Sequence, residues 1–299
     1  MTAKSAKTPT GKRWIAETLF ERLGLRMSYA ADRMLLRRRT AHQEAVVFDH
    51  RLLGKVLMLD GAVQLTDRDE FIYHEMMSHV PILAHGRARE VLIVGGGDCG
   101  IAGEALKHTS IKRVTQVEID AAVVDIAKRH FPELAGRALG DQRFDLLIAD
   151  GVEFVATTER RFDVVIVDST DPHGPGAALF GRRFYAAVKR CLAPGGVMVT
   201  QNGVPFVQPK ELVASVRHWR RLFADASCYV AAVPTYVGGH LAMGWASDEA
   251  GLRRVPLRTI AARYRRAGGF VTRYWTPEVH VAAFALPRYI AALVDRARG

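Results

Sequence analysis

Acidic residues follow four successive apolar stretches of this sequence, at Asp98, Glu118, Asp150 and Asp168. Asp171 lies three residues beyond Asp168, in a loop that contains two prolines. Two carboxylates in a stiff loop are poor for packing and suited to holding an amine or a metal ion. Each aspartate taken alone could instead cap a helix. Taken together, the carboxylates favour a site for cationic groups.

A glycine-rich turn, Gly-Gly-Gly-Asp-Cys-Gly, follows the first of these stretches. Gly95 and Gly97, with Glu118 about 20 residues further on, match the dinucleotide-binding pattern. A helix N-terminus attracts phosphate. However, the negative charge of Asp98 inside the turn opposes a pyrophosphate and favours a cation. A nucleoside without phosphates therefore fits this turn better than NAD.

The next two carboxylates suit such a nucleoside. Glu118 can accept hydrogen bonds from two ribose hydroxyls. Asp150, followed by Gly151, is placed to contact an adenine amino group. Because open α/β sheets bind ligands at the carboxyl ends of adjacent strands, we expect Asp98, Glu118 and Asp150 to share one site.

Two further motifs contain residues capable of chemistry. Residues 67–75 read Asp-Arg-Asp-Glu-Phe-Ile-Tyr-His-Glu. His74 and His79 do not form a zinc helix, because ligands four residues apart share a face whereas five residues rotate the second by about 140°. We expect no metal site. Tyr236, in a Pro-Thr-Tyr motif, could close a pocket or lie in the core.

These residues need a sheet that brings strand ends together. After residue 88, apolar stretches alternate with amphipathic ones, which predicts an α/β fold with a mostly parallel sheet and helices on both faces. The last two strands are expected to form an antiparallel pair joined at Gly238-Gly239. The predicted strands are 91–94, 113–117, 144–148, 162–167, 197–200, 229–237 and 241–246.

The N-terminal region has shorter and more polar patterns. Residues 44–48 and 55–59 alternate like strands, which predicts a small antiparallel β domain. Residues 15–25 are expected to form a helix, and a linking helix over 69–83 is expected to stop near Pro81. The expected organisation is a disordered basic tail at 1–13, the β domain with its linker helix at 14–80, and a Rossmann-like catalytic domain at 81–299.

The net charge of +11 is concentrated at the two ends of the chain. Residues 1–40 contain ten Lys and Arg against three Asp and Glu, and residues 250–299 contain ten against two. The middle contains 22 against 26 and is acidic. The charge therefore implies at most non-specific attraction to nucleic acid by the termini.

Cysteine spacing and hydropathy exclude several classes of protein. Cys99, Cys191 and Cys228 show no CxxC spacing and leave one over, which fits reduced thiols. No apolar run approaches the roughly 18 residues of a membrane span. The basic start is not followed by the apolar segment of a signal peptide. We expect a cytoplasmic protein.

Together the motifs resemble those of the spermidine synthases (polyamine aminopropyltransferases), most closely the bacterial ones, over residues 14–294. The matching segments are 59–61 with Gln64, 69–75, 95–98, 117–120, 150–151, 168–172 and 234–236. The resemblance implies a small N-terminal β domain, a Rossmann-like methyltransferase-type domain and a homodimer. It also implies transfer of an aminopropyl group from decarboxylated S-adenosylmethionine to putrescine, giving spermidine and 5'-methylthioadenosine without a further cofactor.

The resemblance also implies roles for single residues. The position of Asp168 is the proton acceptor in that family. Positions that touch the amine or the aminopropyl chain match Gln64, Tyr73, His74, Asp98, Asp171 and Tyr236. Positions that contact the nucleoside match Gln43, Glu118, Asp150, Gly151 and Pro175.

This chain departs from the family pattern in three places. Cys99 stands where family members usually have Gly, and Gly103 stands where they have Arg. His173 replaces a residue that is usually aliphatic. If residue 99 needs a positive φ, its side chain is expected to crowd the aminopropyl channel.

The residues permit an in-line displacement in which an amine nitrogen attacks the carbon beside a sulfonium. Asp168 is the expected base, since an alkyl ammonium with a pKa of about 10 must lose a proton first. Asp98 would repel the carboxylate of ordinary S-adenosylmethionine.

Other interpretations remain open from the sequence. They are an S-adenosylmethionine-dependent methyltransferase, a non-catalytic binder of polyamine or nucleic acid, and a Rossmann dehydrogenase. Within the aminopropyltransferases, the amine could also be cadaverine, agmatine or spermidine.

Overall fold

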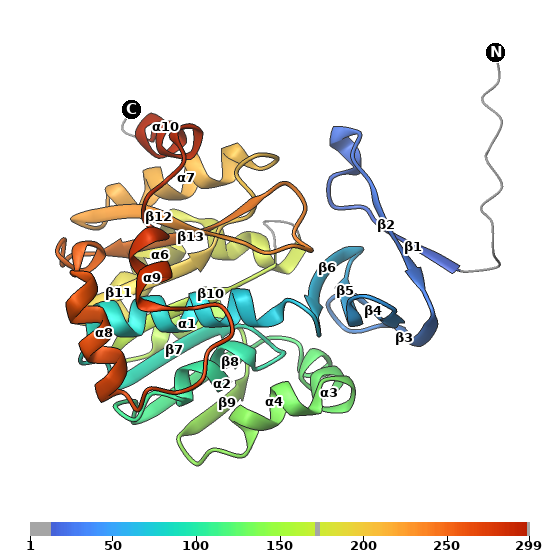
Figure 1. The fold of residues 1–299 in the computed structure, drawn as a ribbon, viewed down its shortest axis with the longest axis horizontal. Coiled ribbons are helices and arrows are strands. Elements are labelled where there is room, and N and C mark those ends of the chain that lie inside the picture. Colours follow the sequence, from blue (N-terminus) through green and yellow to red (C-terminus); the bar gives the residue numbers. More distant parts are fainter. Residues whose placement is uncertain (1–12, 171–173, 298–299) are drawn as a thin grey trace. The chain divides into compact units, whose positions relative to one another are not determined.

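The computed structural model describes residues 13–170 and 174–297, and the chain divides into two compact units between Arg68 and Asp69 (Figure 1). The expected boundary at 80/81 instead falls inside helix α1 (Glu70–His85). This helix packs against the sheet and the helices of the second unit, so its buried face belongs to that unit. The linker helix is therefore part of that unit's core.

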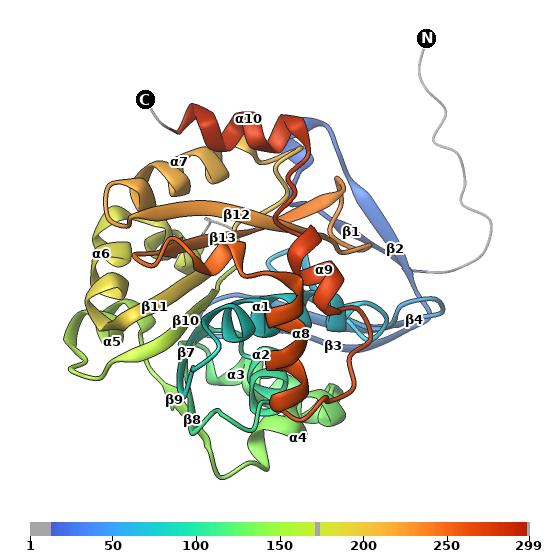
Figure 2. The ribbon, with the colours of Figure 1, turned by 60° about the vertical axis from the view of Figure 1, so that its left-hand side comes forward.

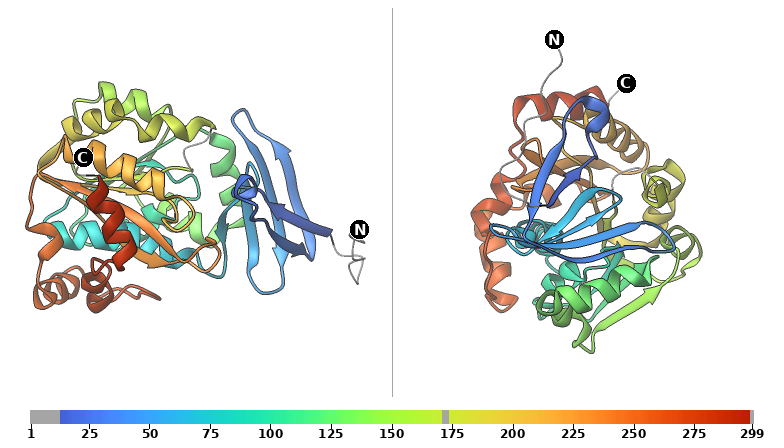
Figure 3. Two further views of the ribbon diagram at one scale, coloured as in Figure 1. Left: turned by 90° about the horizontal axis from the view of Figure 1, so that it is seen from above. Right: turned by 90° about the vertical axis from the view of Figure 1, so that its right-hand side faces the viewer.

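The first unit consists of short antiparallel strands, blue in Figures 1 and 3. One pair of strands and one sheet of four, in the order β3-β4-β5-β6, confirm the predicted antiparallel β structure. Phe48, Val56 and Met58 form part of its small apolar core. The strands are β1 (Arg13–Glu17), β2 (Met27–Ala31), β3 (Arg33–Arg39), β4 (Glu44–His50), β5 (Gly54–Leu59) and β6 (Ala62–Thr66).

The helix predicted over 15–25 is wrong. Residues 13–17 form β1, which pairs antiparallel with β2, and only Glu21–Leu23 form a short 3-10 turn, η1. The buried Glu17 carboxylate accepts hydrogen bonds from the Val63 amide (2.9 Å) and the Tyr29 hydroxyl (3.4 Å). These long-range contacts hold the segment extended and outweigh its helical periodicity. The predicted disordered tail ends one residue too late, at Arg13, and its remainder lies outside the described residues.

The second unit is built on a seven-stranded sheet in the order β12-β13-β11-β10-β7-β8-β9. The five strands from β11 to β9 are parallel, and β13 and β12 join antiparallel, as predicted. The strand predicted over 229–237 is misplaced, because β12 ends at Ala232. A turn follows it, in which the Tyr236 amide donates to the Val233 carbonyl at 3.0 Å. The strands are β7 (Glu90–Gly95), β8 (Arg113–Glu118), β9 (Phe144–Ile148), β10 (Phe162–Asp168), β11 (Leu192–Gln201), β12 (Asp225–Ala232) and β13 (His240–Ser247).

Helices cover both faces of this sheet (Figure 2). Along β10, Val164 and Ile166 face the layer that contains α1 and α2, while Val165 and Val167 face the layer that contains α6 and α7. This alternation explains why the central strands are continuous apolar runs. The remaining helices are α2 (Gly100–Leu106), α3 (Ala121–His130), α4 (Pro132–Leu139), α5 (Gly151–Thr157), α6 (Arg182–Cys191), α7 (Pro209–Arg220), α8 (Leu257–Arg266), α9 (Pro277–Ala282) and α10 (Arg288–Arg296), with 3-10 turns η2 (Gly174–Phe180) and η3 (Leu252–Arg254).

The expected stop near Pro81 is also wrong, because α1 continues through it to His85 and ends at Gly86 with φ 74°. Proline cannot donate a helical hydrogen bond, so packing must compensate. The last turn is buried, and the Arg263 guanidinium donates to the carbonyls of Leu83 (2.8 Å) and Ala84 (2.5 Å). Among the described residues, no helix combines the length and apolarity needed to cross a membrane.

Candidate active site

Four adjacent strands bring the predicted carboxylates to one edge of the sheet. Asp168 ends β10, Asp98 follows β7, Glu118 ends β8 and Asp150 follows β9. These strands are neighbours in the order β10-β7-β8-β9 and are parallel, so their carboxyl ends face the same way. The prediction of a shared edge is confirmed.

Asp168 is held by Tyr73, a residue of α1. The Tyr73 hydroxyl donates to Asp168 Oδ1 at 2.6 Å. Burial, and then the negative charge of Asp98, raise the pKa of Asp168 to about 7. Burial and the charge of Asp168 raise the pKa of Tyr73 well above its ordinary value, so the phenol stays a donor. A carboxylate with a pKa near 7 is suited to accept a proton at neutral pH.

His74 lies between two carboxylates. Its Nδ1 is 2.8 Å from Glu70 Oε2, and its Nε2 is 3.4 Å from Asp98 Oδ1. Burial opposes the charged imidazole, but Asp98 and Glu70 together raise the pKa of His74 well above its ordinary value. His74 and Asp98, both predicted as substrate-binding residues, are thus brought together. Glu70 was not predicted as a site residue, although its spacing of four residues on a helix places it beside His74.

The glycine turn needs its glycines to approach β10 closely. A Cβ at Gly95 would stand 2.0 Å from the Asp168 carbonyl oxygen, and the Gly96 amide donates to that oxygen at 3.1 Å. A Cβ at Gly97 would stand 3.1 Å from Glu118 Oε2. The turn therefore brings its backbone against both carboxylate-bearing strands.

Cys99 adopts φ 64°, so the positive φ considered from the sequence is confirmed. The side chain is fully buried, with Sγ 3.9 Å from the Gly97 carbonyl and from Gln116 Nε2. Burial first, and then Asp98 and Glu118, raise the pKa of this thiol to about 12. The buried thiol is unreactive and packs inside the turn, and a positive φ is a strained conformation for a residue that has a Cβ.

Glu118 and Asp150 have different surroundings. Glu118 is buried, its Oε1 accepts the Asp120 amide at 2.8 Å, and burial raises its pKa to about 7. Asp150 is exposed and caps α5, its Oδ1 accepting the Val152 amide at 2.7 Å. The capping alternative considered for Asp150 is thus realised. Gly151 starts α5 against β7, since a Cβ there would stand 2.5 Å from Val94 Cγ1.

Tyr236 joins the same edge through its contact with Tyr73. The two rings meet edge to face, with centroids 6.0 Å apart. Gln43 and Gln64 belong to the first unit, where Gln43 lies in the turn between β3 and β4 and Gln64 lies in β6. The backbone of Pro175 lies in η2. Asp171 and His173 lie outside the described residues.

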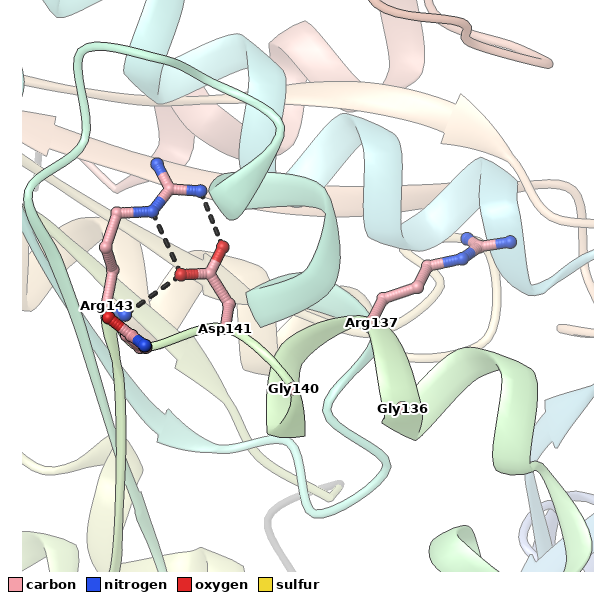
Figure 4. A pocket seen from close by; sticks show the side chains of 6 residues that line it. Gly136, Arg137, Gly140, Asp141 and Arg143 are labelled. Atoms are coloured by element: carbon pink, nitrogen blue, oxygen red, sulfur yellow. Dashed lines mark hydrogen bonds and ion pairs between the residues drawn. The ribbon is translucent and has the colours of Figure 1, made fainter.

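A surface hollow elsewhere contains none of the predicted site residues (Figure 4). Arg143 and Asp141 pair there at 2.6 Å, and the Arg143 guanidinium also donates to three carbonyls at and beyond the end of α2. These bonds give the arginine a structural role at a helix C-terminus. The hollow is lined by Gly136, Arg137, Gly140, Asp141, Gln142 and Arg143.

Comparisons with known proteins show the family to which this chain belongs. Residues 70–255 match the spermine/spermidine synthase domain, and residues 13–67 match the spermidine synthase tetramerisation domain. The chain is 51% identical over 280 residues to polyamine aminopropyltransferase 1 of Pseudomonas aeruginosa, covering 94% of this chain and 97% of the relative. It is also 51% identical over 280 residues to the polyamine aminopropyltransferase of a Ruegeria species, covering 94% and 98%.

Two solved structures resemble the whole chain. A spermidine synthase in complex with the transition state analogue AdoDATO gives a TM-score of 0.89 at 31% identity, covering 96% of this chain and 97% of that one. Spermidine synthase from Thermotoga maritima gives 0.87 at 30% identity, covering 99% of each chain.

Proposed function

Because the chain belongs to the spermine/spermidine synthase family and is an aminopropyltransferase, we propose that it transfers the aminopropyl group of decarboxylated S-adenosylmethionine to putrescine. The products are spermidine and 5'-methylthioadenosine. The observation that carries the proposal is the buried Asp168, hydrogen-bonded by Tyr73 and close enough to Asp98 for its charge to raise the Asp168 pKa. Both substrates are cations, and this edge of the sheet gathers carboxylates.

Asp168 takes the proton that the putrescine ammonium must lose. The freed amine then attacks the carbon beside the sulfonium, one carbon–nitrogen bond forms, one carbon–sulfur bond breaks, and the sulfur leaves as a neutral thioether. Because its pKa is raised to about 7, Asp168 is a better proton acceptor than an ordinary carboxylate. The kcat/KM value is accordingly expected to rise as pH increases through about 7.

Asp98 selects the donor. Its Oδ1 accepts the Gly100 amide at 2.7 Å and faces His74, which fixes the carboxylate at the start of α2. An ammonium gains a charge-assisted hydrogen bond there, whereas the carboxylate of intact S-adenosylmethionine meets like charge. This carboxylate weighs against a methyltransferase. Glu118 is proposed to bind the ribose hydroxyls of the donor. Asp150 and Gly151 are proposed to contact its adenine ring.

The reaction needs no cofactor beyond the donor, because a thioether is a good neutral leaving group without a Lewis acid. Activity is therefore expected to survive dialysis against EDTA, measured as spermidine formed.

We propose that the chain assembles as an oligomer through residues 13–67, as a dimer or a tetramer. Light scattering should give two or four times the mass of one chain. A cytoplasmic location remains a prediction, testable by fractionation.

The decisive test incubates the protein with putrescine and each donor separately. Spermidine is expected only with decarboxylated S-adenosylmethionine, and Asp168→Asn is expected to lower kcat by about 10²- to 10⁴-fold, the range of general-base loss. Methyl transfer from the intact donor, with no spermidine from the other, would overturn the proposal. Parallel rates with cadaverine, agmatine and spermidine define the preferred amine.

A further inference from the structure

The side chain of Asp69 does not serve the helix that it precedes. Asp69 is the N-cap residue of α1, yet its carboxylate makes no capping hydrogen bond to that helix. Asp at this position ordinarily accepts a hydrogen bond from the second or third amide of the helix, which stabilises the helix. Here Oδ2 instead accepts two hydrogen bonds from Thr235, one from its amide (2.9 Å) and one from its hydroxyl (2.7 Å).

The two residues lie 166 positions apart and are both buried: Asp69 is 4% exposed and Thr235 is 7% exposed. A buried carboxylate is costly unless it is well hydrogen-bonded, so these two bonds to one oxygen are strong and are not exchanged with solvent. They attach the segment after β12 to the beginning of α1.

Thr235 directly precedes Tyr236, in the connection from β12 to β13. This connection turns back at once, because the Tyr236 amide donates to the Val233 carbonyl at 3.0 Å. Beyond it, Gly238 and Gly239 have φ of 118° and 106°, a region that other residues rarely adopt. Tyr236 therefore lies between the attachment at Thr235 and two glycines whose backbone conformation few other residues adopt.

Helix α1 also carries Tyr73, the ring that Tyr236 contacts. Tyr73 lies one helical turn after Asp69, packs against Tyr236 with ring centroids 6.0 Å apart, and donates to Asp168. A second tie joins α1 to β12, where the Tyr229 hydroxyl donates to the Met76 carbonyl at 3.0 Å. The position of Tyr236 beside Tyr73 thus depends on how the connection is attached at Asp69.

We propose that Asp69 and Thr235 are positioning residues that hold Tyr236 in place to receive the amine substrate. Neither residue touches the reacting atoms. Their bonds fix the pair of aromatic rings next to the base, so that the methylene chain of a diamine meets a preformed wall. This inference rests on the proposed function, because it takes Asp168 as the base and a diamine as the acceptor.

The test compares two variants at Thr235. Thr235→Val keeps the shape and the amide but removes the hydroxyl, whereas Thr235→Ser keeps both donors. Losing one hydrogen bond to a buried carboxylate is expected to raise KM for putrescine about tenfold in Thr235→Val, with kcat changed less than about twofold. Thr235→Ser is expected to stay within about twofold of the unaltered protein in both constants.

A second measurement does not depend on activity. Hydrogen exchange of the peptide containing residues 233–239 is expected to speed up at least about tenfold in Asp69→Asn, because the amide oxygen lacks the charge that strengthens both bonds. Exchange in β7 serves as the internal reference and is expected to stay unchanged. A variant that failed to fold would show faster exchange in β7 as well, and Thr235→Val then provides the milder perturbation.

The outcomes separate this inference from the proposed function. An unaltered protein that makes no spermidine contradicts the proposed function, while the exchange measurement still tests the attachment of the connection. Normal spermidine synthesis with unchanged KM in Thr235→Val would overturn the positioning role. Equal losses of kcat in Thr235→Val and Thr235→Ser would also overturn it, since only one of them lacks the hydroxyl.

Discussion

At the scale of single residues, the burial that raises the pKa of Asp168 also makes the folded protein less stable at neutral and higher pH. Its pKa is about 7 in the folded protein, against 3.8 for an unperturbed aspartate. Between these values the folded protein retains a proton that the unfolded chain has lost, so this residue's contribution to stability is full below about pH 4 and is lost as pH rises through 7.

Asp168→Asn is expected to remove this pH dependence, because the amide still accepts the Tyr73 hydroxyl and carries no charge. The variant should be more stable than the unaltered protein at pH 8, by about 4 kcal/mol, and the difference should vanish near pH 4. Urea unfolding at the two pH values measures it. An equal difference at both pH values would contradict the assignment of the raised pKa to this carboxyl.

Cys99 offers a second prediction at this scale. Its φ of 64° costs a residue with a Cβ about 1 kcal/mol, which glycine does not incur. Cys99→Gly and Cys99→Ala both lose the buried sulfur, so their difference isolates the backbone. The glycine variant is expected to be more stable by about 1 kcal/mol in urea unfolding, the reverse of the order at an ordinary position. Equal stabilities would show that residue 99 is unstrained.

At the scale of elements, α1 organises the second unit through residues whose chemical types also occur in active sites. Glu75 lies next to His74 in the sequence but points to the segment before α9. Its carboxylate, 1% exposed, accepts the amides of Arg273 (2.7 Å), Tyr274 (2.9 Å) and Trp275 (2.7 Å). Three backbone donors on one carboxylate make a structural clamp.

Glu75→Gln is expected to destabilise the protein by about 2 kcal/mol, because one amide NH₂ must then face backbone donors. Glu133→Gln, at an exposed position of α4, is the matched control and should change stability by less than about 0.5 kcal/mol. Thermal unfolding at neutral pH measures both variants. A loss confined to activity, with stability intact, would place Glu75 in the catalytic machinery instead.

At the scale of the whole molecule, the net charge of +11 and the acidic site act in opposite directions on a dicationic amine. Salt screens distant charges more than close ones, with a Debye length of about 10 Å at 0.1 M. The carboxylates near the base lie close to the substrate path, so we expect them to dominate.

The kcat/KM for putrescine is therefore expected to fall several-fold between low salt and about 0.5 M NaCl, as in steered association. The change should appear mainly in KM. Rates at constant pH over a series of salt concentrations measure it, with intact folding checked by circular dichroism. A rise of kcat/KM with salt would mean that the positive termini control approach.

The sequence by itself determined the parallel strands and the carboxylates that follow them. A buried parallel strand must be apolar on both faces, so residues 91–94 and 164–167 are visible as continuous apolar runs, and the edge that carries the carboxylates follows from the order of the strands. Local patterns could not show that residues 13–17 pair as a strand or that α1 continues through Pro81. Both segments are stabilised by residues distant in the sequence, β1 by pairing with β2 and the end of α1 by Arg263.

Only the tertiary structure decided what each carboxylate does. Asp168, Glu75 and Asp69 are all carboxylates, yet the first accepts the Tyr73 hydroxyl and is the proposed base, the second accepts three backbone amides, and the third holds the connection at Thr235. Their roles differ because burial and hydrogen-bond donors arrive from segments up to 200 positions away. Residue type and spacing fix which chemistry is available, and packing fixes which residue performs it.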